Sequence, residues 1–463
     1  MRPVRGTGYV CSSCGTRAPR WQGRCGGCAE WNTLEASPTA PRAGLVLDAA
    51  TQRLDGVDPE GAARRPTGVA ELDRVLGGGL VAGSTTLLFG EPGVGKSTLA
   101  LTALLAVAAR GESVLLVAAE ESAGQVAGRA RRLGPVPEGV EVTTTTLAPA
   151  AAALIAQRAP VVCVVDSVSA MSDDGLPSAT GSVPQVRQAA ERLCAVAKAQ
   201  GTALVLVGHV TKDGDLAGPR ALEHLVDTVV RVEGDRHGPL RVVRALKHRF
   251  GATGEVGLFE MGEAGLVEVA DVAALAGPRL SVPGVVRTIT NDGSRAFPVD
   301  VQVLVARSAA GPRRVAYQVS AARLSLLLAV LEARCGIDLG PHDVFAAAAG
   351  GLPASEPAVD LALALAVASA ATGAALDPDL VALGEVGLAG ELRAVGGLER
   401  RVREARRRGA GVILAPDQDG AGVDPGAVRP CRSLAEALGA AGLAPVRRRP
   451  SSATMVNPPN APS

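Results

Sequence analysis

With 463 residues, the chain is long enough for about two or three domains that each bury a core of their own. Apolar residues make up 47% and charged residues 20%, which is usual for a globular protein, and the formal net charge is only +1. Overall basicity therefore does not indicate nucleic-acid binding, which would need local basic patches. Because aromatic residues make up 2%, we do not expect base stacking on aromatic side chains to dominate such binding.

The N-terminus lacks the apolar core of a signal peptide. The longest apolar run, residues 361–376, is rich in alanine and shorter than the roughly 20 residues that a membrane span needs. We therefore expect a buried helix there and a cytoplasmic protein.

Residues 1–35 carry a C-x2-C-x10-C-x2-C pattern formed by Cys11, Cys14, Cys25 and Cys28. Two pairs of thiolates on tight turns are what tetrahedral Zn²⁺ needs, and a module this short cannot fold on its apolar core alone. The pattern predicts a zinc ribbon with these four ligands. A redox pair of C-x-x-C motifs is the alternative.

Two further expectations concern the tryptophans and the remaining cysteines. We expect Trp21 and Trp31 to pack around the metal rather than to stack on bases. The other cysteines lie in apolar segments and predict small buried thiols without a disulfide framework. They are Cys163, Cys194, Cys335 and Cys431.

The rest of the chain predicts an α/β protein with two larger domains. Residues 36–65 are rich in proline, alanine and glycine and fit a linker. Residues 66–272 alternate β-rich runs with helical stretches, which favours a P-loop domain around a largely parallel sheet. A second α/β domain is expected at 275–445, and the arginine- and proline-rich tail 446–463 is expected to be disordered. The strands predicted in the first domain cover residues 84–89, 113–118, 160–165, 203–207, 228–232 and 240–245.

A P-loop pattern, G-x-x-x-x-G-K-S, follows the first of these strands and precedes a predicted helix at 97–109. Successive loop N–H groups and the helix N-terminus form a concave anion site for phosphates. Lys96 would neutralise the β- and γ-phosphates of ATP, and the Ser97 hydroxyl would ligate Mg²⁺. The predicted nucleotide-binding residues are Gly90, Glu91, Pro92, Gly93, Val94, Gly95, Lys96, Ser97 and Thr98.

Two carboxylates follow apolar strands farther along the chain. Asp166 ends the run 161–165 and would hold the Mg²⁺ shell, although capping of the next helix is the alternative. Glu120 and Glu121 follow the run 113–118. A carboxylate there can polarise the attacking water, and Glu120 is the predicted base, with Glu121 as the alternative.

Other polar residues follow later strands. His209, which follows the strand 203–207 after one glycine, would sense the γ-phosphate, or would be an ordinary surface-loop histidine. Lys247 and Arg249 concentrate charge after the last predicted strand, where a solvated hairpin end is the alternative. The chain has only four lysines, Lys96, Lys198, Lys212 and Lys247, and three of them fall in segments assigned to nucleotide or DNA contact.

Nearly the whole chain resembles the bacterial RadA/Sms family of DNA repair ATPases. The likeness rests on the four cysteines, on residues 67–79 (TGVAELDRVLGGG) before the P-loop, and on the segments 166–167, 208–214 and 222–228. The family signature K-N-R-F-G stands here as residues 247–251, with His248 in place of asparagine.

This resemblance implies a hexameric ring with ATP bound between RecA-like domains. It further implies binding of single-stranded and branched DNA, cooperation with the recombinase RecA, and ATP-driven branch migration. Lys247 and Arg249 would act on the ATP of a neighbouring subunit, and such an arginine finger contributes roughly 10³–10⁵ in rate.

The domain at 275–445 resembles the proteolytic domain of Lon proteases, which uses a Ser–Lys dyad. Ala358 occupies the serine position, and Glu399 occupies the lysine position. No lysine follows Lys247, so the domain has no lysine from which to build a dyad. We therefore expect an inactive platform for assembly and DNA contact, with the arginines of 400–408 as phosphate contacts or as a solvated helix face.

Three functions remain open on these grounds. The leading hypothesis is a DNA-stimulated ATPase that drives branch migration in recombinational repair. An ATP-gated scaffold that binds DNA and partners without translocating would use the same residues. An ATP-dependent protease is disfavoured by the missing dyad.

Overall fold

A computed structural model describes residues 8–14, 16–18, 20–37, 64–176, 178–209, 222–234, 238–263, 265–269, 271–272, 276–309, 311–349, 354–417 and 424–443. The chain divides into two compact units, Met1–Gly61 and Ala62–Ser463. The predicted α/β class is confirmed, whereas the domain boundaries drawn from the sequence stay predictions. Lys212, most of the expected linker and the expected tail lie outside the described residues.

The first unit holds a small antiparallel sheet in the order β2-β1-β3. Its strands are β1 (Gly8–Cys11), β2 (Arg17–Ala18) and β3 (Leu34–Ser37). Its buried residues are Cys11, Cys25 and Leu34. The prediction for the tryptophans was wrong: Trp21 and Trp31 are 54% and 69% exposed, because so small a core is filled by the cysteines and Leu34.

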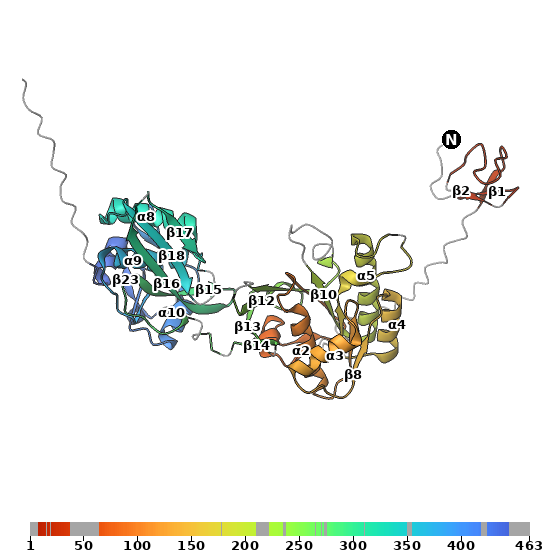
Figure 1. Ribbon diagram of the computed structural model, residues 1–463, viewed down its shortest axis with the longest axis horizontal. Coiled ribbons are helices and arrows are strands. Elements are labelled where there is room, and N and C mark those ends of the chain that lie inside the picture. The colour runs from red at the N-terminus through yellow and green to blue at the C-terminus, as the bar shows by residue number, and fades with distance from the viewer. Residues whose placement is uncertain are drawn as a thin grey trace, which may run out of the picture. The chain divides into compact units, whose positions relative to one another are not determined.

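A nine-stranded sheet forms the first part of the second unit (Figure 1), in the order β14-β13-β12-β11-β6-β10-β9-β7-β8. The strands from β11 to β8 in this order are parallel, and β12, β13 and β14 add antiparallel strands at one side. The strands are β6 (Thr85–Gly90), β7 (Val114–Ala118), β8 (Val140–Thr143), β9 (Val162–Asp166), β10 (Ala203–His209), β11 (Thr228–Gly234), β12 (Leu240–His248), β13 (Val256–Gly262) and β14 (Gly265–Glu268). A separate pair, β4 (Arg64–Arg65) and β5 (Leu80–Val81), precedes β6.

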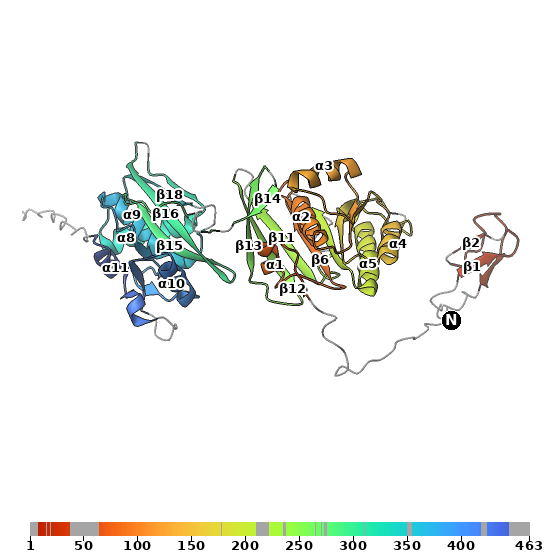
Figure 2. The same ribbon diagram turned by 90° about the horizontal axis from the view of Figure 1, so that it is seen from below.

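Helices cover both faces of this sheet (Figure 2) because the side chains of its central strands are apolar on both sides. One face packs on α1 (Ala70–Val75), α2 (Lys96–Ala108) and α3 (Ala123–Leu133). The other packs on α4 (Ala148–Arg158), η3 (Val168–Ala170) and α5 (Val183–Gln200). This is the three-layer arrangement expected of alternating strands and helices.

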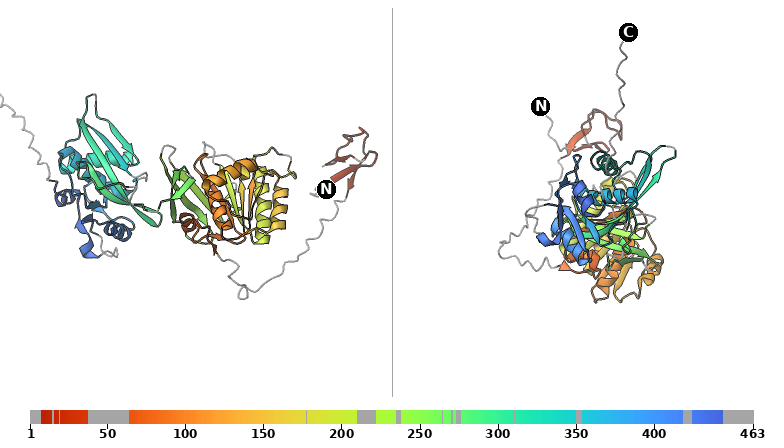
Figure 3. Two further views of the ribbon diagram at one scale, coloured as in Figure 1. Left: turned by 60° about the horizontal axis from the view of Figure 1, so that its bottom comes forward. Right: turned by 90° about the vertical axis from the view of Figure 1, so that its left-hand side faces the viewer.

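A seven-stranded mixed sheet follows, in the order β17-β18-β16-β15-β19-β22-β23. Its strands are β15 (Val285–Asp292), β16 (Arg295–Arg307), β17 (Arg314–Tyr317), β18 (His342–Ala349), β19 (Leu380–Ala382), β22 (Val412–Pro416) and β23 (Arg429–Cys431). A short hairpin pairs β20 (Glu385–Val386) with β21 (Leu392–Arg393). β15 and β16 form a long hairpin whose turn extends from this sheet (Figure 3).

Helices also cover both faces of the second sheet. On one face lie α8 (Ala321–Cys335), α9 (Asp360–Thr372) and α11 (Leu434–Ala440), and on the other lies α10 (Leu398–Arg407). Two short turns, η4 (Pro357–Val359) and η5 (Pro425–Ala427), precede α9 and β23, respectively. The predicted buried helix is α9, which is buried along most of its length. Within the described residues, no helix combines the length and apolarity that crossing a membrane requires.

Candidate nucleotide site and metal centre

Neighbouring parallel strands bring the predicted nucleotide residues to one edge of the nine-stranded sheet. Gly90 ends β6 and pairs with His209, the last residue of β10. Asp166 ends β9 and pairs with Ala118, the last residue of β7, so Glu120 follows at the same edge. The carboxyl edge of a parallel sheet is where α/β proteins bind ligands.

Two glycines allow the P-loop to approach its surroundings closely. A Cβ on Gly90 would lie 2.2 Å from the carbonyl oxygen of Val232 on the neighbouring strand. Gly95 has a φ of 108°, and a Cβ there would lie 2.9 Å from both Leu266 and Met261 of the β13–β14 hairpin. The hairpin therefore packs directly on the start of α2.

The Lys96 side chain folds back onto its own loop. Its Nζ donates to the carbonyl oxygens of Gly90, at 3.0 Å, and Glu91, at 2.9 Å. Burial lowers the pKa of Lys96, and the nearby Asp166 and Glu120 carboxylates oppose that shift. One ammonium group thus lies close to both predicted catalytic carboxylates.

Asp166 lies in a partly buried position at the end of β9. Burial raises its pKa, while a hydrogen bond from the Ser97 side chain and the charge of Arg129 oppose the rise. The Arg129 Nη1 atom lies 4.0 Å from Asp166 Oδ2. The contact between Ser97 and Asp166 brings together the hydroxyl and the carboxylate that the sequence predicts as Mg²⁺ ligands, so these donors fit a hard divalent cation.

Glu120 and Glu121 differ in their partners. The hydroxyl of Ser167 donates to Glu120 Oε1, and His209 Nε2 lies 3.7 Å from Glu120 Oε2. Glu121 instead forms an ion pair with Arg129 of α3. Glu120 is therefore joined to the tips of β9 and β10, whereas Glu121 is joined to a helix.

Sequence reasoning missed three polar residues near this edge. Ser167 directly follows Asp166, so its place after a strand was a usable signal. Arg129 lies in α3 and Arg241 lies on β12, beside Gly93 in a hollow next to the P-loop. Neither arginine stands out among the many arginines of the chain, because only the folded sheet brings them to the site.

Lys247 and Arg249 lie at the opposite edge of the sheet from the P-loop. At the P-loop edge, β11 pairs Val232 with Gly90, whereas at the other edge it pairs Thr228 with His248, which lies between the two cations. The structure therefore does not bring Lys247 and Arg249 together with Lys96 of the same chain.

Both cations hold the segment that leads into β11. Lys247 Nζ donates to the carbonyl oxygens of Glu223, at 2.6 Å, and Val226, at 2.8 Å. Arg249 pairs with Asp227 at 2.9 Å, and its side chain is 56% exposed. The Arg249 guanidinium is thus accessible to another molecule, while Lys247 is engaged.

His248, at the asparagine position of the signature, is buried between these cations. Its Nδ1 lies 3.0 Å from Thr228 Oγ1, and its Nε2 has no hydrogen-bond partner among the described residues. Burial and the charge of Arg64 lower its pKa. The histidine therefore favours its neutral form.

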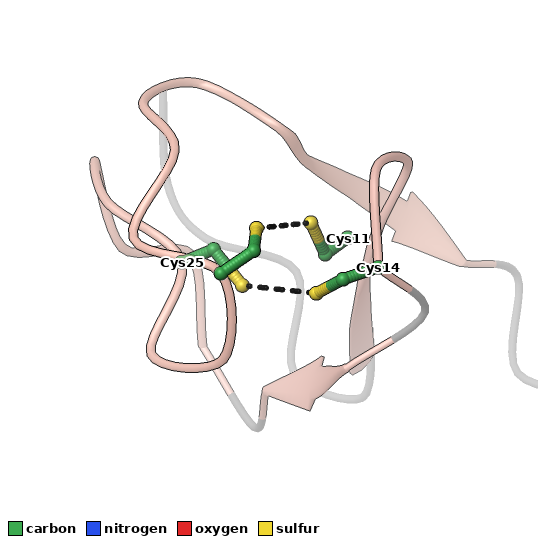
Figure 4. A group of neighbouring side chains, drawn as sticks. Cys11, Cys14 and Cys25 are labelled. Carbon is green, nitrogen blue, oxygen red and sulfur yellow. Dashed lines mark hydrogen bonds between the residues drawn. The ribbon is translucent and has the colours of Figure 1, made fainter.

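The four ribbon cysteines point their sulfurs toward a common centre (Figure 4). The Sγ atoms of Cys11 and Cys28, and those of Cys14 and Cys25, are 3.6 Å apart, and all four lie within 4.8 Å of one another. A tetrahedron with Zn–S bonds of about 2.3 Å needs sulfurs about 3.8 Å apart, so the cluster fits zinc.

The surroundings favour the thiolate at two of these cysteines but not at Cys28, where a backbone hydrogen bond with Glu30 is outweighed by burial and the neighbouring thiols, which raise the pKa to about 12. A hydrogen bond with the Thr33 hydroxyl lowers the pKa of Cys11 to about 6. A hydrogen bond with the Thr16 hydroxyl lowers the pKa of Cys14. All eight cysteines are free, and of the four outside the ribbon, Cys194 is only partly buried.

The two positions that correspond to a Lon dyad lie in surroundings that do not form a catalytic site. Ala358 is 3% exposed and packs in the apolar cluster under α10. Glu399 lies on the surface of α10 and pairs with Arg403. Nearby, Arg401 is buried and forms an ion pair with Glu356.

Comparison with known families gives three matches along the chain. Residues 9–36 match a model described as a rubredoxin metal binding domain. Residues 51–215 match an AAA domain, and residues 342–427 match the Lon protease (S16) C-terminal proteolytic domain. The first and second matches support a zinc-binding ribbon and an ATP-binding domain.

Comparison with curated proteins finds relatives over most of the chain. DNA repair protein RadA of Pseudomonas aeruginosa is 45% identical, with 88% of this chain and 92% of that protein covered. The protein of the same name from Mycolicibacterium smegmatis is 43% identical, with 88% and 91% covered. That from Bacillus subtilis is 39% identical, with 88% and 92% covered.

Proposed function

The chain belongs to the RadA family of DNA repair proteins, and on that premise we propose that it is a DNA-stimulated ATPase. It binds single-stranded and branched DNA, works with RecA and drives branch migration as a hexameric ring. The observation that carries the catalytic part is the position of Lys96, Asp166 and Glu120 at one edge of the sheet, where β6, β7 and β9 end. An ATP-gated scaffold without translocation is the second candidate, since it would use the same site.

Each residue at the edge has a separate task in this proposal. Phosphate oxygens replace the carbonyls that hold Lys96, so its ammonium group neutralises the β/γ charge. Ser97 and Asp166 would hold Mg²⁺, which would supply charge neutralisation at the phosphates. The residues from Gly90 to Thr98 provide the surrounding N–H groups.

Glu120 is the proposed base that orients and polarises the attacking water. Its contacts with Ser167 and His209 support this role, because they connect the carboxylate to two strand tips at the nucleotide edge. Glu121 forms an ion pair with Arg129 and is therefore the weaker candidate for the base. His209, next to Glu120, is the proposed sensor of the γ-phosphate.

Lys247 and Arg249 are proposed to stabilise transition-state charge on the ATP of a neighbouring subunit. Their place at the edge opposite the P-loop supports action in trans, since they lie away from the nucleotide of their own chain. This arrangement requires a ring or filament in which one subunit presents that edge to the next.

The C-terminal domain is proposed to serve as a platform for assembly and DNA contact. The arginines of 400–408 are not a free basic stripe: Arg403 pairs with Glu399, and Arg407 and Arg408 pair with Glu404. They are nevertheless in excess over these two carboxylates, so a contribution to phosphate binding remains part of the proposal.

The decisive experiment measures ATP turnover with and without single-stranded DNA, alongside branch migration of a RecA-made joint molecule. The motor requires DNA-stimulated turnover and ATP-dependent migration, both lost in Lys96→Ala. Turnover and DNA binding without any migration would favour the scaffold. Absence of ATP turnover under all conditions would reject both forms of the proposal.

A further inference from the structure

The turn of the β15–β16 hairpin, residues 292–295, contacts two parts of the second unit. On one side Arg400, next to the degenerate Lon position Glu399, donates to the carbonyl oxygen of Gly293 at 3.1 Å. On the other it meets the loop between β12 and β13, residues 249–255, which begins with Arg249. Figures 2 and 3 show that the hairpin extends well beyond the sheet to which it belongs.

An ion pair between a buried arginine, Arg401, and a partly buried glutamate, Glu356, anchors the end of β15. Arg401 is 2% exposed, and its Nη1 and Nη2 atoms donate to the two carboxylate oxygens of Glu356 at 2.7 Å each. Glu356 Oε1 also accepts from the Asn291 amide at 2.7 Å and from the Thr290 hydroxyl at 2.8 Å. Arg401 further donates to the carbonyl of Ile289 at 2.6 Å.

This pair is satisfied on both sides, which is the condition under which a buried charge is tolerated. Burial disfavours ionisation of Glu356, but the hydrogen bonds from Arg401, Asn291 and Thr290 outweigh it and lower its pKa. Removal of one member would leave the other charge uncompensated. Substitution of either Glu356 or Arg401 should therefore destabilise the end of β15.

The turn itself is in direct backbone contact with the loop that carries Arg249. The Ser294 amide donates to the carbonyl oxygen of Gly254 at 2.5 Å. A Cβ on Gly293 would lie 1.8 Å from that same oxygen, so only glycine permits this approach. Asp292 pairs with Arg244 of β12, three residues before Lys247.

A second arginine secures the other strand of the hairpin. Arg295 pairs with Glu71 of α1 and donates to the carbonyl of Val256, the first residue of β13, at 3.0 Å. The hairpin thus contacts the chain at Gly254, near the end of the loop 249–255, and at Val256, directly after that loop.

We infer that Glu356 and Arg401 are positioning residues for ATP hydrolysis, acting through the hairpin turn to fix the loop that presents Arg249. Residues beside the two degenerate Lon positions hold the hairpin, and the hairpin holds the loop. The inference rests on the proposed action of Arg249 in trans. Misplacement of a charged group by about 1 Å can cost about 10² in rate, so a support of this kind matters for a residue that reaches a neighbouring subunit.

The sharpest test is Gly293→Ala in the full chain, because the added methyl group would separate the turn from Gly254. The matched control is Gly373→Ala: its φ is 69°, against 57° for Gly293, but nothing lies within 4 Å of its Cβ. We expect kcat for ATP to fall about 3- to 20-fold in Gly293→Ala, with KM within about twofold, and the control to stay near the wild type.

A second variant, Glu356→Gln, addresses the anchor. Hydrogen exchange of the full chain should show faster exchange at the Asn291 and Ser294 amides and through residues 249–255, together with the same selective fall in kcat. The control Glu399→Gln removes an exposed carboxylate from the same region and should change neither. Wild-type kcat and wild-type exchange in the loop for Gly293→Ala would overturn the inference.

Mixed assemblies separate this inference from the proposed function. Gly293→Ala subunits have an intact P-loop, and Lys96→Ala subunits have an intact Arg249 loop. Mixing the two should restore turnover at the interfaces that combine the intact halves. If Arg249→Ala subunits are rescued in this way but Gly293→Ala subunits are not, the positioning inference is wrong, while the proposed action of Arg249 in trans stands. If Arg249→Ala has wild-type turnover, the proposed action in trans fails.

Discussion

At the scale of single residues, Lys96 is the group on which ATP turnover should depend most. Replacement by alanine removes the only lysine of the P-loop, and Lys96→Arg places a planar fork where a compact charge is needed. We expect both variants to lose at least about 10² in kcat, measured by phosphate release. Lys198→Ala, on α5, is the control and should retain turnover. Near-wild-type hydrolysis by either Lys96 variant would remove this residue from the site.

The neighbouring glutamates offer a second test at this scale. Glu120→Gln should lower kcat by roughly 10²–10⁴ while nucleotide binding persists, since the amide cannot act as a base. Glu121→Gln breaks the ion pair with Arg129 and should have a small effect on kcat. Comparing kcat with the affinity for a fluorescent ATP analogue distinguishes the two. The reverse pattern would transfer the role to Glu121.

At the scale of elements, the sequence predicts the central strands well, because four or more consecutive apolar residues between turn signals mark a strand buried on both faces. The expected strand 203–207 is β10, and the expected helix 97–109 is α2. β8 and the β13–β14 hairpin were not predicted. β8 and β14 have four residues each, and β8 is only partly buried, so neither gives a clear period. In β13, Gly257 interrupts the apolar run.

In the candidate site, too, the sequence predicts the features that local patterns encode and misses the contacts between distant segments. The P-loop and Asp166 follow from local patterns, since a loop and the strand before it are adjacent in the sequence. The contacts of Glu120 with Ser167 and His209 join three strands that are far apart in the chain, and no local pattern specifies them. The exposure of Trp21 and Trp31 was missed because a ribbon held by four thiols needs little apolar packing.

The zinc ribbon can be tested as an element by itself. Full-length protein purified without chelator should contain one Zn²⁺ per chain, because the sulfur spacing suits a tetrahedral ion. Cys11→Ser should lose the metal and unfold residues 8–37, while ATP binding persists. Cys194→Ser, on α5, removes a thiol outside the ribbon and should keep the zinc. Metal analysis that finds no zinc in the wild-type protein would contradict the prediction.

At the scale of the whole molecule, opposite edges of one sheet carry the P-loop and the exposed Arg249. Arg249→Ala should preserve nucleotide binding yet lower kcat by roughly 10³–10⁵. Mixing it with Lys96→Ala subunits should restore part of the turnover, because some interfaces then pair an intact P-loop with an intact Arg249. Native mass spectrometry must show that mixed assemblies form. Mixed assemblies without any rescue would argue against action in trans.

The C-terminal domain should have no peptidase activity on casein or fluorogenic peptides, with or without ATP and DNA. Ala358 offers no nucleophile, and no lysine after Lys247 can serve as a base. Even Ala358→Ser should stay inactive, because that position is buried under α10 and the surface residue Glu399 replaces the lysine. DNA affinity should instead fall steeply with salt, as expected when arginines neutralise phosphates. Peptide cleavage that disappears in Lys96→Ala would restore the protease hypothesis, since it would tie proteolysis to the nucleotide site of this chain.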